Sequence, residues 1–295
     1  MGESGSPLHR VERLGRGSVE RLGRRSVVAT MSAVAVLATV LASCGGGSSG
    51  SSKEQGDSAR PAGGRTGFTS TCTAEPRPQL GLDTTWKVCA DNGFDPSTDT
   101  FSFENYDGPV AGDAVTVPMA VQMFGAKAVC VSATASTCQA TPAAQQWIDQ
   151  ANQDISGGRC EGLAVMSQRI REGRDQAAAL QPGAAHTLDL QKDTASVASS
   201  IGRWWATQDY PEVEAKAAAV RDKNPETVAE GVAAAITDKQ GATIGIYFTE
   251  GGHALTPIAV AWDGADTLKI VVYDSNFPET LKSIDVDMKQ HTWSY

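Results

Sequence analysis

The sequence lacks the features that mark metal sites, nucleotide sites and nucleic-acid binders. It has only 4 histidines, and His186 and His291 have no partners at zinc-ligand spacing, so no metal site is expected. A phosphate loop and a dinucleotide-binding fingerprint are both missing, so no cofactor is expected either. The formal net charge is −9, and the clustered arginines all lie between Arg10 and Arg25. A nucleic-acid partner, which needs clustered Lys and Arg, is therefore not expected.

The chain also lacks an apolar run long enough to cross a membrane. The longest candidate, Val27–Leu41, falls short of the ~20 residues that a spanning helix needs. Arginines precede it and small residues follow it, which is typical of a signal peptide. We therefore predict that residues 1–43 are a signal peptide and that the rest of the chain is exported.

The residues that follow this run, Leu41-Ala42-Ser43-Cys44, resemble the lipobox of bacterial lipoproteins. The resemblance implies that Cys44 becomes the lipid-modified N-terminus and anchors the protein to the cell membrane outside the cytoplasm. The alternative is an ordinary secretory signal with a cysteine there by chance. Residues 44–67 are rich in Gly and Ser and predict a flexible tether between the membrane and the folded part.

The full sequence is 41% hydrophobic, so the part of the chain after the tether can bury a core. Residues 68–140 show irregular signals and are expected to pack on a main domain of residues 141–295. In that domain apolar periodicity predicts helices and then antiparallel strands, which defines an α+β fold. The expected helices are 142–153, 160–172, 193–206 and one that begins at 224; the expected strands are 243–248, 253–262, 267–273 and 283–287; residues 115–124 could be either.

The cysteine count predicts two local disulfides and one free thiol. The chain has 6 cysteines, and setting Cys44 aside leaves an odd number. Disulfides persist outside the cytoplasm. Spacing makes two pairings plausible, Cys72 with Cys89 and Cys130 with Cys138, which leaves Cys160 unpaired. The free thiol is then either a buried core cysteine or a functional one.

The neighbours of Cys160 favour a functional thiol. Cys160 follows Gly157-Gly158-Arg159 and begins a predicted helix, where free N–H groups favour a thiolate. A strand pair with its turn at Gly264-Ala265 brings His253 beside Asp274 or Asn276. Such a partner would orient the imidazole, as the third member of a catalytic triad does.

Three segments resemble papain-like cysteine peptidases in their divergent bacterial forms. They are GGRCEGLAVMSQRI around Cys160, GGHALTPIAV around His253 and VVYDSNFP around Asp274. The resemblance implies a helical half followed by an antiparallel β half. It also implies a nucleophile Cys160, a base His253, an orienting Asp274 and a side-chain amide, from Asn152 or Gln153, that stabilises the oxyanion. The expected substrate is a peptide or another component of the cell envelope.

Two other functions remain open. RCEGLA partly matches the Asp-Cys-Ser-Gly motif of a family of cell-wall hydrolases. Glu161, directly after the cysteine, favours a peptidase-like domain without turnover that binds peptides or envelope partners. The reactivity of Cys160 would distinguish an enzyme from a binding module.

Overall fold

The described chain is organised around an antiparallel sheet. The computed structural model describes residues 35–38, 67–108, 112–132, 137–248 and 251–295, all of which belong to one unit, Ser32–Tyr295. The strands are β1 (Ala35–Ala38), β2 (Lys87–Asp91), β3 (Ala242–Phe248), β4 (Gly251–Trp262), β5 (Thr267–Tyr273), β6 (Leu281–Asp287) and β7 (Thr292–Ser294). They follow the order β1-β3-β4-β5-β6-β7, and β2 also pairs with β4.

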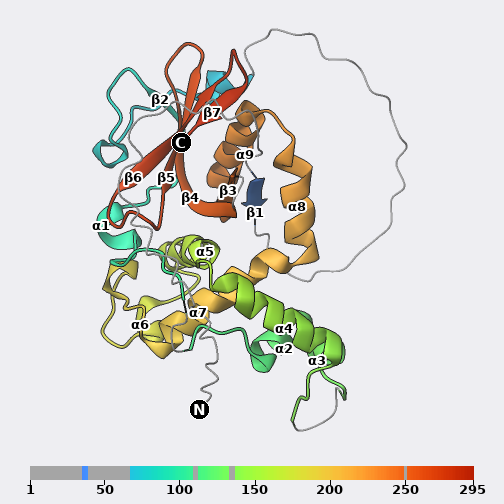
Figure 1. Ribbon diagram of the computed structural model, residues 1–295. Helices are drawn as coiled ribbons and strands as arrows, with labels where there is room; N and C mark the ends of the chain where they lie inside the picture. Colours follow the sequence, from blue (N-terminus) through green and yellow to red (C-terminus); the bar gives the residue numbers. More distant parts are fainter. Residues whose placement is uncertain (1–34, 39–66, 109–111, 133–136, 249–250) are drawn as a thin grey trace, which may run out of the picture. The chain divides into compact units, whose positions relative to one another are not determined.

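The helices are α1 (Pro96–Asp99), α2 (Val117–Phe124), α3 (Ala126–Val129), α4 (Pro142–Ile155), α5 (Cys160–Arg171), α6 (Ala177–Leu180), α7 (Ala195–Ala206), α8 (Pro211–Arg221) and α9 (Pro225–Thr237). In Figure 1, α9 lies along the sheet beside β3, whereas α5 lies with α7 below it. Short 3-10 turns cover Gly67–Thr71, Pro78–Leu80, Thr187–Asp189 and Thr207–Asp209.

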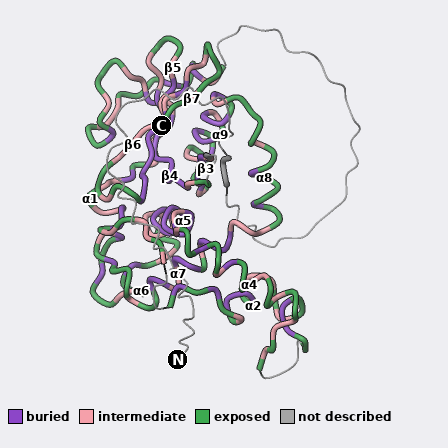
Figure 2. Tube along the Cα trace, viewed as in Figure 1, coloured by how far each residue is buried: buried purple, intermediate pink, exposed green. Residues whose placement is uncertain are grey.

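Two apolar clusters hold α5 and α9 on opposite faces of the sheet. Leu163 and Met166 of α5 pack with Ile258 of β4, and Val228 and Val232 of α9 pack with other residues of the sheet. Figure 2 shows buried residues concentrated in α5 and the central strands, whereas α8 is largely exposed. The start of α5 is therefore fixed against the sheet by its own buried face.

The predicted α+β class and the two predicted disulfides are confirmed. The described elements include helices followed by an antiparallel sheet. Cys72 is bonded to Cys89 and Cys130 to Cys138, and Cys160 is free.

Three elements, α2, β2 and α8, were either left open by the sequence or not expected from it. Residues 117–124 are helical, because Thr116 caps the helix and proline occupies its first turn. Strand β2 lies in the segment expected to be irregular, where the Cys72–Cys89 bond ties it down next to β4. Helix α8 was not predicted, because only Val213 and Ala217 along it are buried and its apolar periodicity is weak.

Part of the predicted signal peptide forms a strand of the sheet. Ala35–Ala38, inside the apolar run, form β1 and pair antiparallel with Ala242–Gly245 of β3. The rest of the predicted signal peptide, Cys44 and most of the predicted tether lie outside the described residues. In the part of the chain that the structure describes, no helix has both the length and the apolar character needed to span a membrane.

Candidate active site

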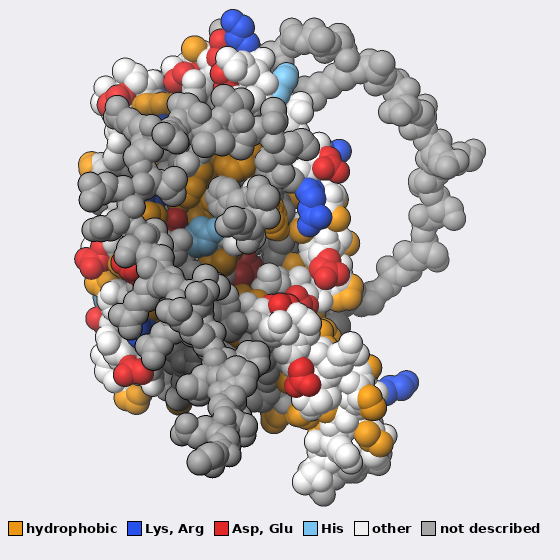
Figure 3. All heavy atoms as spheres, viewed as in Figure 1, with side chains coloured by type: hydrophobic (Ala, Val, Ile, Leu, Met, Phe, Trp, Pro, Cys, Tyr) orange, Lys and Arg blue, Asp and Glu red, His pale blue; other side chains and the backbone are white. Residues whose placement is uncertain are grey.

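A cleft with a volume of about 1220 Å³ lies where α5 begins beside β3 and β4, with α8 along it. Its lining includes Cys160, His253, Asp274 and Asn276, so the structure brings four of the five predicted catalytic residues to one place. Figure 3 shows acidic side chains on the helical side of this face of the molecule.

Cys160 is the first residue of α5 and is half-buried. Arg159, at the N-cap position, provides no side-chain cap, so within the described part of the chain N–H groups of the first turn remain free for a ligand. Gly158 has a φ of 145°, and a Cβ there would lie 3.2 Å from the Nδ2 atom of Asn105. The glycine therefore allows both the turn into α5 and the close approach of Asn105.

Arg159 anchors the nucleophile from inside the protein. Its side chain is 1% exposed and forms an ion pair with Asp113 at 2.5 Å. It also donates to the backbone carbonyl of Tyr106 at 3.1 Å, and its guanidinium lies over the Tyr106 ring. A buried charge held by this many partners fixes the backbone directly before Cys160.

His253 is positioned by the register of the sheet. Thr256 of β4 pairs with Tyr273, the last residue of β5, so His253 and Asp274 lie just beyond this last pair of the two strands. His253 Nε2 lies 2.6 Å from Asp274 Oδ1 and 3.2 Å from Asn276 Nδ2. Both partners expected from the sequence thus approach the same ring nitrogen, which leaves Nδ1 for Cys160.

The electrostatics of the site favour a protonated histidine. Burial alone lowers the pKa of His253, but hydrogen bonds and charge interactions with Asp274 and Cys160 outweigh it and raise the pKa to about 9. Burial alone would raise the pKa of Asp274, but its hydrogen bond with His253 and the histidine charge bring it below its usual value. The pair is arranged as a carboxylate and an imidazolium.

Tyr295 is a further member of the site that the sequence analysis missed. Its hydroxyl donates to Asp274 Oδ2, the oxygen that His253 does not use. Burial and this hydrogen bond raise the pKa of Tyr295, so it stays a neutral donor. Nothing in the local sequence links Tyr295 to Asp274, because β6 and β7 separate them along the chain.

The structure does not bring Gln153 or Asn152 into the cleft. Helix α4 buries Ile148, Ala151 and Ile155, and the helical period turns Gln153 to the exposed opposite face. Asn152 is used structurally: its side-chain amide accepts from the backbone N–H of Val115 at 2.7 Å and donates to its carbonyl at 2.9 Å.

Asn105 presents a side-chain amide at the cleft, where the sequence led us to expect Gln153. Its Oδ1 accepts the backbone N–H of Arg159 at 2.7 Å, which turns Nδ2 the other way. Nδ2 has no hydrogen-bond partner among the described residues, and Asn105 lines the cleft beside Gly158 and Cys160. Its backbone N–H donates to the carbonyl of Ser275 at 2.8 Å, so Asn105 bridges the cysteine and histidine sides.

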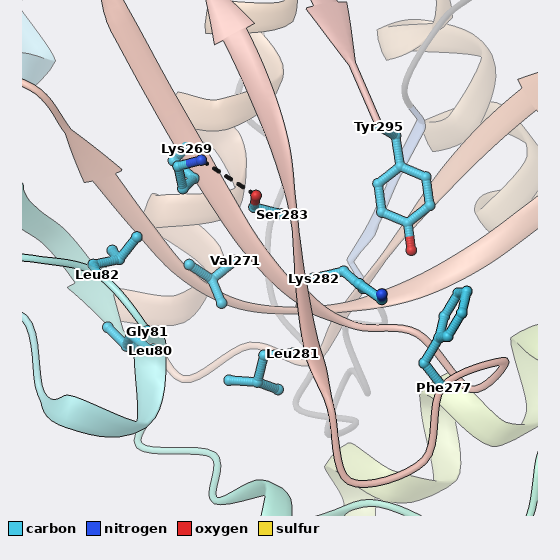
Figure 4. Close-up of a pocket in the computed structure, with 10 residues that line it drawn as sticks. All are labelled: Leu80, Gly81, Leu82, Lys269, Val271, Phe277, Leu281, Lys282, Ser283 and Tyr295. Atoms are coloured by element: carbon cyan, nitrogen blue, oxygen red, sulfur yellow. Dashed lines mark hydrogen bonds between the residues drawn. The ribbon is translucent and has the colours of Figure 1, made fainter. Parts of the chain in front are cut away.

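A second hollow of about 590 Å³ adjoins the cleft (Figure 4). Phe277 and Tyr295 line both spaces and form the boundary between them. The Nζ atom of Lys282 lies 3.9 Å from the centre of the Phe277 ring. Phe277 and Tyr295 are each 45% exposed, so two half-exposed aromatic side chains separate the two spaces.

Within the described residues, no group of three or more His, Cys, Asp or Glu side chains is arranged to hold a metal ion. Comparison with known proteins adds no relative: no family model, curated protein or solved structure matches this chain.

Proposed function

We propose that this protein is a cysteine hydrolase that cleaves peptide or amide bonds outside the cytoplasm, with a papain-like arrangement of its catalytic groups. One observation carries the proposal. His253 is held by Asp274 through Nε2 and interacts with a free cysteine that begins a helix, in a cleft large enough for a peptide. These are the relations expected of a nucleophile, its base and the group that orients the base.

The geometry supports the following acylation step. In the resting ion pair the proton of Cys160 already lies on His253, and the thiolate sulfur attacks the carbonyl carbon of the scissile bond. The resulting oxyanion receives hydrogen bonds from Asn105 Nδ2 and from the free N–H groups at the start of α5. The imidazolium then protonates the leaving amine as the carbon–nitrogen bond breaks, which leaves a thioester on Cys160.

Hydrolysis of the thioester reverses these roles. His253 takes a proton from water while the water oxygen attacks the thioester carbon. Cys160 leaves as the thiolate, and the acid product departs. Throughout, the carboxylate of Asp274 keeps Nε2 protonated, so Nδ1 remains the nitrogen that exchanges protons.

The order of elements supports the papain-like assignment. The cysteine begins a helix in the helical part, and the histidine and aspartate follow on adjacent antiparallel strands. Two disulfides in the described residues fit an oxidising compartment. We propose that lipid on Cys44 holds the domain on the extracytoplasmic face of the cell membrane.

The test is the rate of Cys160 alkylation by iodoacetamide as a function of pH. The other described cysteines are in disulfides, so mass spectrometry assigns the label to Cys160. The proposal predicts rapid alkylation below pH 7, lost in His253→Ala, and peptide turnover lost in Cys160→Ser. A thiol that reacts only near the ordinary cysteine pKa of ~8.5 would overturn it.

The second candidate is a peptidase-like binding module without turnover. Glu161, buried directly beside the nucleophile, favours it. It predicts that Cys160→Ala leaves peptide binding unchanged and that the native protein does not consume peptide.

A further inference from the structure

Glu161 is a buried acid that reaches the cleft. It is 7% exposed and belongs to the cleft lining next to Cys160. Its Oε1 accepts a hydrogen bond from Thr243 Oγ1 at 3.1 Å. Among the described residues, no Lys or Arg side chain forms an ion pair with it, and Oε2 has no hydrogen-bond partner. The catalytic steps proposed above do not use this carboxylate.

An acid so placed lacks a counter-charge. Burial raises the pKa of Glu161 to about 7, and the Thr243 hydrogen bond only partly opposes it. A bound ammonium or guanidinium would supply the missing charge and bond to Oε2. The same cleft is lined by further acids from α4, the adjacent 3-10 turn and α8, namely Asp154, Asp209 and Glu214. Arg221 also lines it, but lies by the Tyr247 ring.

The edge of β3 indicates how a peptide would reach Glu161. β1 pairs with this edge, with residue 37 opposite Thr243 and residue 35 opposite Gly245, so the edge accepts an extended segment. Directly opposite residues of an antiparallel pair project to the same face of the sheet, with Cβ atoms about 5 Å apart. The Thr243 side chain points to Glu161. A peptide residue opposite Thr243 therefore presents its side chain on the face where Glu161 lies.

We infer that, once removal of the predicted signal peptide has freed the edge of β3 from β1, the cleft selects extended peptides with a basic side chain, received by Glu161 when the peptide pairs with this edge opposite Thr243. The inference rests on the proposed function in taking a peptide as the ligand and an exported, processed chain as the protein. Glu161 is then a residue that determines specificity, and the acids of α4 and α8 favour the approach of cationic peptides.

The experiment separates recognition from turnover. The protein is isolated from an exporting bacterial host, so that any leader processing has occurred, and carries Cys160→Ser to prevent cleavage. Fluorescence anisotropy measures binding of matched peptide libraries that carry lysine, norleucine or glutamate at each position in turn. Glu161→Gln removes the charge at nearly constant size, and Glu161→Asp retains it. Gln153→Ala, on the exposed face of α4, serves as the control.

At one peptide position, lysine is expected to bind about tenfold or more tightly than norleucine, and glutamate more weakly than either. Glu161→Gln should remove that preference, whereas Glu161→Asp and Gln153→Ala should keep its sign. If the protein with Glu161 intact binds the lysine and norleucine peptides equally at every position, the inference is overturned, regardless of how the Glu161 variants bind. An intact preference in Glu161→Gln would also overturn it. A preference that depends on Glu161 in a protein whose native form does not cleave peptides would support the inference and refute the hydrolase.

Discussion

The two sides of the cleft hold their catalytic residues by different means. On the cysteine side, a buried ion pair between Arg159 and Asp113 fixes the backbone before Cys160, with help from Asn105. On the histidine side, the pairing of β4 with β5 sets His253 beside Asp274. The first arrangement depends on side chains from a distant segment, and the second on the regular geometry of a sheet.

This difference shows which side tolerates change. A sheet register is shared among many backbone hydrogen bonds, so no single side chain maintains it. On the cysteine side, only the two residues of a buried ion pair hold the backbone in place, and the loss of either one leaves an uncompensated buried charge. The predictions below test this contrast, from the largest expected effect to the smallest.

Arg159→Ala should reduce stability most, because it leaves Asp113 buried without its cation. We expect a loss of about 3–5 kcal/mol in the free energy of unfolding, measured by urea denaturation with the disulfides intact. Arg174→Ala, which breaks the more exposed pair with Glu172, is the control and should cost less than about 1 kcal/mol. Equal losses in the two variants would show that the buried pair has no special role.

Asp274→Asn should leave the fold intact and reduce kcat by about 10³-fold, because the orienting charge is lost. The dependence of activity on pH also tests the direction in which Asp274 shifts the pKa of His253. The raised pKa keeps His253 protonated until the pH passes about 9, above its ordinary value of 6.5, so the active ion pair should be lost on that alkaline limb. In the variant the limb should move to lower pH. If the alkaline limb of the Asp274→Asn profile stays at the same pH, Asp274 is not the cause of the raised pKa of His253.

Asn105→Ala should reduce kcat by about 10²-fold through loss of one donor to the oxyanion, with a smaller change in KM. Gln153→Ala is the matched control and should leave kcat unchanged, since its side chain is exposed on α4. A loss in the control and none in Asn105→Ala would return the oxyanion role to the residue expected from the sequence.

Tyr295→Phe should have the smallest effect. It removes one hydrogen bond to Asp274 and keeps the ring, so we expect a loss in kcat of less than about tenfold. A steady-state assay of this variant beside Asp274→Asn would measure how far the tyrosine supports the carboxylate. An effect as large as that of Asp274→Asn would mean that the aspartate cannot hold His253 alone.

The same contrast explains what the sequence could and could not predict. The turn at Gly264 and the alternating apolar residues on both sides of it predicted an antiparallel pair of strands that brings His253 near Asp274 and Asn276, and the structure places the three side chains together. The odd number of cysteines and their spacing made the two disulfide pairings plausible, and the structure contains both. These signals are local or periodic, so they can be read along the chain.

Asn105, Asp113 and Tyr295 carried no such signal. Asn105 and Asp113 lie in a segment without apolar periodicity, and their partners are far away in sequence: Arg159 is 54 residues from Asn105 and 46 from Asp113. Gln153 was expected in the oxyanion role because it precedes the cysteine in the chain, but the helical period turned it outward. Contacts of this kind are set by tertiary packing and require the structure.

Asn105 has a mechanical consequence for any opening of the cleft. Its side chain accepts a hydrogen bond from the backbone of Arg159, and its backbone N–H donates to the carbonyl of Ser275. Asn105 therefore links the cysteine side of the cleft to the histidine side through hydrogen bonds. Moving them apart at this point would break one of these bonds and release the amide from its orientation. Substrate entry and product release should therefore proceed at the far end of the cleft, along β3 and α8, while the end that carries out the chemistry stays closed.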